Sequence, residues 1–387
     1  MQGKTSSGRK GVKIKIAIIG AGIGGLTTAL FLERQGFEVQ LFEQSNEIKL
    51  IGAGIILAHN AMQVFDKLNL KETITEQGKA LTSFKIKTSK FEDINEINTQ
   101  TFGRKFSVSS IAIKRSELQA LLLKEIQTTQ ISLGKRVIGF NTEQETSIHF
   151  ADGSSFPCDT VISADGIHSI TRRELFKTGI IRKPGQTCWR GISTINLPKA
   201  YKSELNELWG KGSRFGFVEV SENQVYWYGL HNSKRELEQS ELLDLFQNYA
   251  PIVADIITST PTDNIHLSEI SDLKPIPNWH KNTVCLLGDA AHATTPNMGQ
   301  SACQAIEDAF VLSHYLGKHP AELAFAKFEE SRKEKARRVV NMSWWLGYIS
   351  QLESPVLSAI RNFLFRKAPK KYNSEQTEKI YSLPDCQ

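Results

Sequence analysis

Residues 16–25 read Ile-Ala-Ile-Ile-Gly-Ala-Gly-Ile-Gly-Gly, an apolar run that leads directly into a glycine-rich turn. A helical pattern follows over Leu26–Gln35, and a second apolar strand over Val39–Phe42 ends at Glu43. This order of strand, turn, helix and strand, with glycines spaced as G-x-G-x-x-G, is typical of a dinucleotide-binding unit. The stretch therefore predicts an α/β fold that begins with a Rossmann-like unit.

Each glycine of this turn meets a different steric requirement. Gly20 permits the tight turn, Gly22 lets the backbone approach a pyrophosphate, and Gly25 lets the helix and strand pack closely. The pyrophosphate is then expected at the helix N-terminus. Glu43 lies 18 positions after Gly25, near the spacing of a carboxylate that accepts a hydrogen bond from a ribose 2′-hydroxyl. The motif does not separate FAD from NAD, because both contain adenosine diphosphate.

A second strand–loop–helix unit lies far along the chain, over residues 284–309. Its apolar run ends at Gly288-Asp289, a loop runs from Pro296 to Gly299, and a helical pattern opens at about Ser301. A carboxylate at a strand end accepts hydrogen bonds from the hydroxyls of a sugar-like chain, and a helix N-terminus stabilises negative charge on a ring. A flavin has both parts, so the unit favours FAD; a plain packing unit is the alternative.

A third signal is the short strand Asp159–Ser163, which ends in the turn Ala164-Asp165-Gly166. An Asp-Gly turn after a strand places a carboxylate at a sheet edge, although such turns are common in proteins without any ligand.

The three segments together resemble the single-component FAD-dependent aromatic hydroxylases, a family that includes salicylate, para-hydroxybenzoate and urate hydroxylases and, more distantly, zeaxanthin epoxidase. The resemblance covers roughly Lys13–Gly347. It implies a mixed α/β fold of the para-hydroxybenzoate hydroxylase type. In this fold a Rossmann-like FAD-binding domain is joined to a β-sheet substrate domain and C-terminal helices.

The resemblance also implies roles for single residues. It places Asp289 at the ribityl chain of FAD, Asp165 near both FAD and NAD(P)H, and Arg115, in an Arg-x-x-Leu context, near the FAD phosphates. Val137 matches a position that meets the adenine side. The expected FAD-binding residues are Gly20, Gly22, Ile23, Gly24, Gly25, Glu43, Arg115, Val137, Asp165, Gly288, Asp289, Pro296, Gly299, Gln300 and Ser301.

One segment departs from the pattern of many members. They read Gly-Gln-Gly-x-Asn where this chain has Gly299-Gln300-Ser301-Ala302-Cys303. Cysteine at the last position is similar to the urate hydroxylase and zeaxanthin epoxidase branches.

Because one FAD must touch all three segments, its domain is predicted to be discontinuous, over 1–78, 105–182 and 279–340. A β-rich substrate domain is expected over 79–104 and 183–278, with a hairpin turn at Ser221-Glu222-Asn223. Residues 341–387 are expected to form a C-terminal helical segment. Three residues of the predicted sheet, Arg190, Arg214 and Tyr226, are candidates for orienting the substrate; packing within the sheet is the alternative.

Bulk composition narrows the class of protein. The chain has 387 residues, a net charge of +6 and five scattered cysteines without a C-x-x-C pair. This cysteine usage favours reduced thiols in the cytoplasm and disfavours a metal site. The polar, basic Met1–Lys13 has no apolar core and is not expected to act as a signal peptide. No transmembrane helix is predicted, and no basic stripe is interleaved with aromatics as in nucleic-acid binders. The basic end at Arg366-Lys367 and Lys370-Lys371 favours a packing helix with solvated lysines over a membrane contact. A monomer or a homodimer is expected.

The predicted function is a monooxygenase that uses NAD(P)H as a transient reductant and O₂ to hydroxylate a small aromatic or conjugated substrate. The resemblance implies oxygen transfer through a flavin C4a-hydroperoxide, so the cofactor carries the chemistry. No second G-x-G-x-x-G marks a stable NAD(P)H site. Within the family, epoxidation and inactivating hydroxylation of an antibiotic remain alternatives. Outside it, the alternative is a non-catalytic FAD-binding sensor or partner module.

Overall fold

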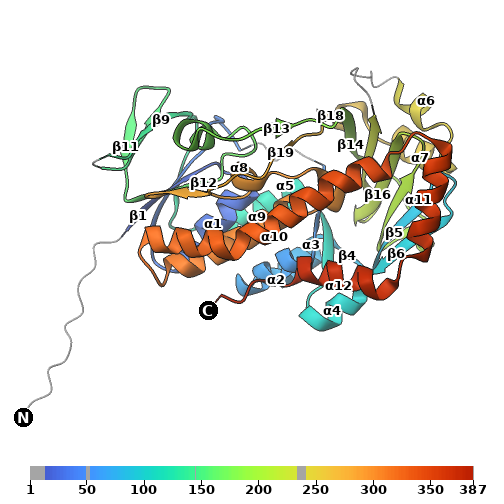
Figure 1. Cartoon of the computed structure of the whole chain (residues 1–387), viewed down its shortest axis with the longest axis horizontal. Coiled ribbons are helices and arrows are strands. Elements are labelled where there is room, and N and C mark those ends of the chain that lie inside the picture. Colours follow the sequence, from blue (N-terminus) through green and yellow to red (C-terminus); the bar gives the residue numbers. More distant parts are fainter. Residues whose placement is uncertain (1–13, 49–52, 144, 233–240, 387) are drawn as a thin grey trace, which may run out of the picture.

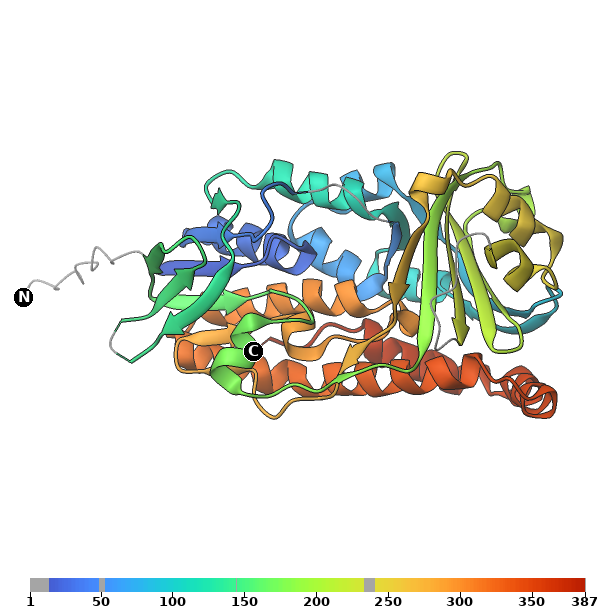
Figure 2. The same cartoon turned by 90° about the horizontal axis from the view of Figure 1, so that it is seen from above.

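The computed structural model describes residues 14–48, 53–143, 145–232 and 241–386, so the basic N-terminal segment Met1–Lys13 lies outside the described residues. Two β-sheets lie at opposite ends of an elongated molecule, and the C-terminal helices run along both (Figures 1 and 2). The six-stranded sheet has the order β20-β21-β12-β1-β2-β8. Its strands are His280–Lys281, Val284–Leu286, Thr160–Ser163, Lys15–Ile19, Glu38–Phe42 and Gln130–Ser132, in that order.

The three predicted strand ends meet at the centre of this sheet. Strand β1 pairs in parallel with β12, and β12 pairs in parallel with β21. Ile19 lies opposite Ser163, and Ser163 lies opposite Leu286. The carboxyl ends of parallel strands face the same edge of a sheet, so the three segments converge there, as the sequence predicted.

Glycines allow the segments to touch. A side chain at Gly25 would place its Cβ 2.0 Å from the Gly20 carbonyl oxygen. Gly20 itself has φ +101°, and a Cβ there would lie 2.5 Å from the Ala164 oxygen. Helix α1 (Ile23–Arg34) also packs on α9 (Ser301–Leu316), where a Cβ at Gly24 would lie 3.2 Å from that of Ala305. Close packing here requires glycine for steric reasons.

The seven-stranded sheet has the order β18-β14-β17-β16-β15-β5-β6. Its strands are His266–Glu269, Gln186–Thr194, Gln224–Asn232, Ser213–Ser221, Glu204–Trp209, Ser83–Thr88 and Asp93–Asn98, in that order. The expected hairpin is present between β16 and β17, and β5 and β6 come from the segment that was expected to extend the sheet. One face is covered by α6 (Leu242–Phe246) and α7 (Pro251–Thr258), which pack on Phe215 and Trp227.

Smaller elements connect the two ends of the molecule. A three-stranded sheet of β3 (Gly54–Leu57), β7 (Ser110–Lys114) and β4 (Lys79–Leu81) leads into α5 (Arg115–Glu125). The other elements are α2 His59–Lys67, α3 Lys71–Gln77, α4 Gln100–Phe106, β9 Val137–Asn141, β10 Ser147–Phe150, β11 Ser155–Pro157, a π-helical turn Arg172–Phe176, β13 Ile181–Arg182, β19 Asp272–Leu273 and α8 Asp289–His292.

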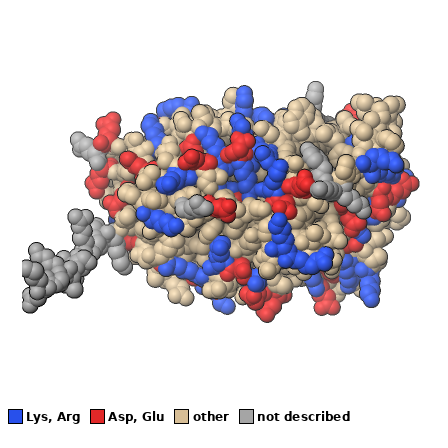
Figure 3. Space-filling view, turned by 60° about the horizontal axis from the view of Figure 1, so that its bottom comes forward, with Lys and Arg blue, Asp and Glu red and all other residues tan. Residues whose placement is uncertain are grey.

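The chain ends in three helices: α10 (Ala321–Ser350), α11 (Pro355–Lys367) and α12 (Lys370–Tyr381). Helix α10 has 30 residues and runs through position 340, where the sequence placed a domain boundary. Trp344 and Trp345 therefore belong to α10 rather than to the final helix. Apart from the boundary at position 340, we propose the same three-part domain division that the sequence predicts. Figure 3 shows charges of both signs scattered over one face of the molecule.

A fully buried ionic cluster joins α9 to α10. The guanidinium of Arg332 donates from Nε to Asp308 Oδ1 at 2.7 Å and from Nη1 to Glu307 Oε1. Lys335 Nζ contacts both Glu307 oxygens, at 2.6 and 2.8 Å. Two adjacent carboxylates are thus buried only because cations from α10 compensate them.

We expect replacement of Arg332 by Met to destabilise the protein by about 3–5 kcal/mol, since two buried carboxylates lose their main partner. Urea or thermal unfolding of the FAD-loaded protein measures this. The matched control is Arg337→Met on the same helix, whose pair with Glu334 at 2.7 Å is solvent-exposed and should contribute about 1 kcal/mol or less. Equal losses in the two variants would contradict the assignment of the cluster as the main α9–α10 clamp.

Candidate active site

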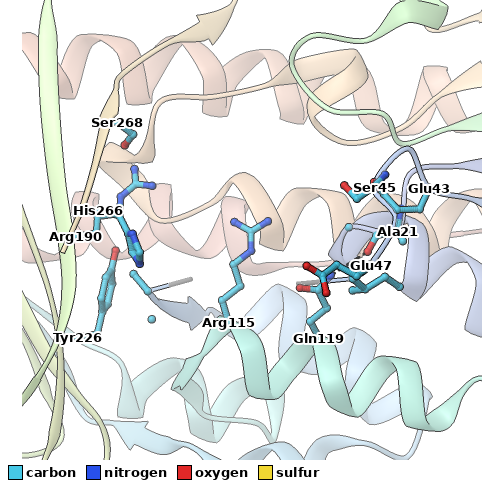
Figure 4. A pocket seen from close by; sticks show the side chains of 14 residues that line it. Ala21, Glu43, Ser45, Glu47, Arg115, Gln119, Arg190, Tyr226, His266 and Ser268 are labelled. Atoms are coloured by element: carbon cyan, nitrogen blue, oxygen red, sulfur yellow. Dashed lines mark hydrogen bonds between the residues drawn. The ribbon is translucent and has the colours of Figure 1, made fainter. Parts of the chain in front are cut away.

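A cavity of about 480 Å³ extends from the glycine-rich turn to the seven-stranded sheet. Figure 4 shows Glu43, Ser45 and Ala21 at one end, Arg115 near the middle, and Arg190, His266 and Tyr226 at the other end. The described residues that line it are Ala21, Gly22, Glu43, Ser45, Glu47, Ile48, Ala53, Gly54, Arg115, Gln119, Arg190, Tyr226, His266 and Ser268. An elongated cavity with a carboxylate at one end suits a ligand with a nucleotide at that end.

Glu43 is held rigidly at the cavity wall. Its Oε2 accepts from the backbone N–H of Ala21 at 2.9 Å, and its Oε1 accepts from that of Ser45 at 2.9 Å. A carboxylate has about four acceptor positions, so lone pairs remain for a sugar hydroxyl. The position fits the expected role at the ribose.

The middle of the cavity suits a phosphate group. A Cβ built on Gly22 would meet nothing within 4 Å, which shows that the backbone at the start of α1 faces open space. Arg115, the first residue of α5, points its guanidinium into the same space (Figure 4). No ion pair or hydrogen bond joins that guanidinium to another residue of the described ranges. A cation and a helix N-terminus that face one cavity attract a pyrophosphate.

The Gly288-Asp289 turn is built by the buried cluster. Gly288 has φ +60°, and its N–H donates to Asp308 Oδ2 at 3.0 Å. His292 Nε2 lies 2.6 Å from the same oxygen, so this histidine steadies the turn. Ser301 donates from Oγ to Asp289 Oδ1 at 2.7 Å. The serine that replaces glycine here thus orients the carboxylate predicted to meet the ribityl chain.

Cys303, the other departure from the common pattern, packs α9 against the β3–α2 connection. Its buried Sγ lies 3.4 Å from the Ile56 carbonyl oxygen and accepts from the Ala58 N–H at 3.4 Å. Gln300 is buried beside it and contacts Asn60 at 3.3 Å and Gln304 at 2.9 Å. Gly299 adopts φ +62° at the end of the Pro296–Met298 turn. None of these side chains is among the described residues that line the cavity.

Of the fifteen predicted cofactor residues, Gly22, Glu43 and Arg115 are among the described lining residues, and the other twelve, which include Asp289, Asp165 and Val137, are not. Asp165 accepts from Ser163 Oγ at 2.6 Å and from the N–H and Oγ1 of Thr171, both at 3.2 Å, so its carboxylate shapes its own turn. Arg172 donates to the Ala290 oxygen at 2.7 Å and thereby ties this turn to the Gly288 segment. Val137 is buried in β9 opposite Phe150. Direct contact of Asp165 and Val137 with FAD remains a proposal.

Tyr226 and Arg190 share the sheet face at the other end of the cavity. Arg190 lies opposite Tyr228 in the ladder of β14 and β17, so it points to the same side as Tyr226, two positions before Tyr228. Burial raises the pKa of the Tyr226 phenol to about 12 even though Arg190 lowers it. The phenol is therefore a neutral hydrogen-bond donor at physiological pH.

Arg214 shares this face but is engaged elsewhere. It is buried, lies 3.3 Å from Glu207 Oε1 through Nη1, and donates through Nη2 to Asn297 Oδ1. Glu207 also accepts from Trp209 Nε1 at 2.6 Å and from the Tyr228 hydroxyl at 2.5 Å. Arg214 therefore carries a neutralised charge and links the sheet to the Pro296–Gly299 loop.

Sequence reasoning missed several lining residues. Gln119 lies one helical turn after Arg115, so the i, i+4 spacing on α5 offered a signal. His266 and Ser268 come from β18, whose pairing with β14 has no local signature. Glu207 offered no signal either, because its partners Arg214 and Tyr228 lie on other strands.

Comparison with known proteins places the chain in a family. Residues 13–343 match a family model described as an FAD binding domain. The chain is 33% identical to the aurachin C monooxygenase/isomerase of Stigmatella aurantiaca, with 91% of this chain and 94% of that protein covered. It is 30% identical to the 2-heptyl-3-hydroxy-4(1H)-quinolone synthase of Pseudomonas aeruginosa, with 95% and 97% covered.

The fold agrees with these matches. A solved structure of Klebsiella pneumoniae HpxO complexed with FAD and uric acid is similar, with a TM-score of 0.86 and 25% identity, and 95% of this chain and 96% of that chain are covered. The chain belongs to the single-component FAD-dependent aromatic hydroxylases, a family of flavoprotein monooxygenases, and its cofactor is FAD. The fold expected from the sequence is confirmed.

We expect Arg115→Met to weaken FAD binding about 10-fold to 100-fold, because a charge-assisted contact to phosphate contributes about 1.5–3 kcal/mol. Fluorescence titration of the stripped protein with FAD measures this. Lys114→Met is the matched control, since Lys114 pairs with Glu117 at 2.9 Å and is not among the described lining residues. Unchanged FAD affinity in the Arg115 variant would remove that residue from the phosphate site.

Proposed function

We propose that the protein uses NAD(P)H and O₂ to hydroxylate an uncharged, fused N-heteroaromatic substrate of the 2-alkyl-4(1H)-quinolone class. In the balanced reaction, substrate, O₂, NAD(P)H and a proton give the hydroxylated product, NAD(P)⁺ and water. A ring C–H bond is replaced by C–O–H, and the second oxygen atom leaves as water. The relative whose name describes a 3-hydroxy-4(1H)-quinolone product covers nearly the whole chain and supports this substrate class.

The observation that carries the proposal is the pairing of Arg214 with Glu207. An uncompensated Arg214 would add a second cation to the sheet face that already carries Arg190, and would favour an anionic ring. Here the Arg214 guanidinium lies 3.3 Å from the partly buried carboxylate of Glu207 and donates to an amide oxygen of the loop, so its charge is compensated before any substrate binds. Burying an anionic substrate against a neutral pair costs more than burying an uncharged one.

The acid–base groups at this end also suit such a ring. Tyr226 is a hydrogen-bond donor with a pKa raised to about 12 by burial, so it donates to a carbonyl oxygen rather than removing a proton. A 4-quinolone is a vinylogous amide whose ring nitrogen already donates electron density to C3. It therefore needs orientation more than deprotonation. We assign that orientation to Tyr226, with Arg190 as a cation beside the same oxygen.

The remaining residues bind the cofactor and keep water out. FAD, when bound at these residues, would supply the hydride acceptor for NAD(P)H and the chemistry of O₂ activation and oxygen transfer. We assign the ribose to Glu43, the pyrophosphate to Gly22 and Arg115, and the ribityl chain to Asp289. The start of α9 stabilises negative charge at the flavin ring, with Gly299, Gln300 and Ser301 shaping its approach.

The direct test is substrate-stimulated NAD(P)H oxidation by the purified yellow protein. We expect 2-heptyl-4(1H)-quinolone to stimulate oxidation and to yield a product heavier by one oxygen atom, measured by mass spectrometry. Uric acid and 6-hydroxynicotinate, which are anionic at neutral pH, serve as matched comparisons and should stimulate weakly. Strong stimulation by urate alone would contradict the proposed substrate class. FAD that NAD(P)H cannot reduce with any of these compounds would favour a non-catalytic FAD-binding module.

The charge argument has its own test in Glu207→Gln, which keeps the shape of the side chain but removes its charge. Since Arg214 is then uncompensated, we expect KM for the neutral quinolone to rise about tenfold, or about 1.4 kcal/mol. KM for urate should fall, with kcat changing less than KM. Glu204→Gln is the control, because Glu204 lies on the opposite face of β15 and pairs with Lys85 at 2.5 Å. Steady-state kinetics with each substrate measure these changes. If KM for the quinolone and KM for urate changed in the same direction, the charge argument would be wrong.

A further inference from the structure

Helix α11 has an unusual composition for a surface helix. Residues 354–374 contain five cations, Arg361, Arg366, Lys367, Lys370 and Lys371, and no Asp or Glu. Within this stretch, the 13 residues of α11 include seven apolar residues larger than alanine: Pro355, Val356, Leu357, Ile360, Phe363, Leu364 and Phe365. For the basic end of this stretch, at Arg366-Lys367 and Lys370-Lys371, the sequence favours a packing helix with solvated lysines over a membrane contact.

The structure places the apolar residues outward. Val356, Ile360, Phe363 and Leu364 form one stripe at helical spacing, and their exposed fractions are 67%, 51%, 59% and 58%. Leu357 beside them is 52% exposed. Of the fifteen large apolar side chains that are exposed in the described residues, eight lie within residues 345–364. Such clustering marks an interaction surface, whereas single exposed apolar residues are ordinary.

The orientation of α11 is fixed from its inner side. The Arg361 guanidinium is buried, donates to the carbonyl oxygens of Ile349 and Ser350 at 3.0 and 2.9 Å, and lies over the Trp209 ring at 4.8 Å. Phe365 packs against the same ring at 5.2 Å. Arg361 and Phe365 therefore hold one side of α11 against the protein, and the apolar stripe on its other side remains exposed to solvent.

The charges of residues 354–374 distinguish between two partners that could cover the apolar stripe, a second copy of this chain and a lipid bilayer. Arg366 and Lys367 are exposed at the end of the stripe, with Arg366 lying 3.5 Å from Glu92. A second copy that packed along residues 354–374 would cover the stripe but would bring no acid from these residues to the cations. An anionic lipid surface offers the complementary charge to these cations and an apolar layer for the stripe. No helix in the described part of the chain is long and apolar enough to cross a membrane, so the contact is peripheral.

We infer that α11, with Trp345, Tyr348 and Ile349 at the end of α10, is a docking surface for an anionic lipid bilayer. The helix lies in the plane of the interface and buries its stripe among the lipids. This docking does not depend on the proposed function, but its benefit does, because an alkylated quinolone partitions into lipid. Trp209 joins the two sites: it packs on Arg361 and Phe365 and donates to Glu207 at 2.6 Å.

Vesicle flotation with the FAD-loaded full chain tests the inference. Vesicles of phosphatidylcholine with phosphatidylglycerol should carry the protein upward, and vesicles of phosphatidylcholine alone should carry at least tenfold less. The double variant Ile360→Asp/Phe363→Asp should lose at least tenfold in binding to anionic vesicles. The control Ile180→Asp/Leu323→Asp, at residues that are 63% and 48% exposed elsewhere, should bind as the unmodified protein does.

Three outcomes would overturn the inference: no binding of the unmodified protein to anionic vesicles, an equal loss in the control, or a dimer by light scattering that the double variant dissociates while vesicles bind neither form. FAD content and the thermal midpoint of each variant confirm that it is folded. Flotation requires no turnover, so a failure of docking and a failure of the proposed reaction are separate results.

Discussion

The buried carboxylate of Asp308 is the point on which the cofactor side of the molecule depends. One of its oxygens receives the N–H of Gly288 and the ring of His292, and the other receives Arg332 from α10. Burial alone would raise the pKa of Asp308, but His292 and Arg332 outweigh it and hold the pKa below its ordinary value. The group therefore remains charged, and it fixes the turn at Gly288, the start of α9 and the long helix α10 relative to one another.

From this fixed point the nucleotide site follows by close packing. Gly24 lets α1 approach Ala305 of α9, and Gly20 lets the first strand end approach Ala164. Three segments separated by more than a hundred residues thus share one sheet edge. A cavity then opens beside Gly22, between the carboxylate of Glu43 and the guanidinium of Arg115. Backbone geometry creates the space, and two charged side chains determine which ligand it suits.

The substrate side is joined to the cofactor side by a polar contact. Arg214 of β16 reaches Asn297 in the loop that precedes α9, while Glu207 compensates its charge. One side chain thereby links the sheet to the Pro296–Gly299 loop, and its charge is compensated within the protein. Outside the same strands, α11 rests on Trp209 and turns its apolar stripe to solvent. The proposed preference for an uncharged substrate and the proposed membrane contact thus depend on neighbouring side chains.

The sequence by itself determined the local features of this protein. It identified the strand ends at Gly20, Asp165 and Gly288 and the hairpin at Ser221-Glu222-Asn223, because periodicity and turn chemistry depend on nearby residues. Arg115 came from the family resemblance. The sequence also identified the family, because three separate segments, at Gly20–Gly25, Asp165-Gly166 and Gly288-Asp289, together resemble the family's pattern. Only the tertiary structure decided that Asp165 is spent on its own turn, that Glu207 neutralises Arg214, and that the apolar face of α11 points outward. Asp165 is held by Ser163 and Thr171, which lie nearby in the sequence but take up this geometry only in the folded turn. The other two facts depend on which distant segments the fold brings together, and no local pattern encodes that choice.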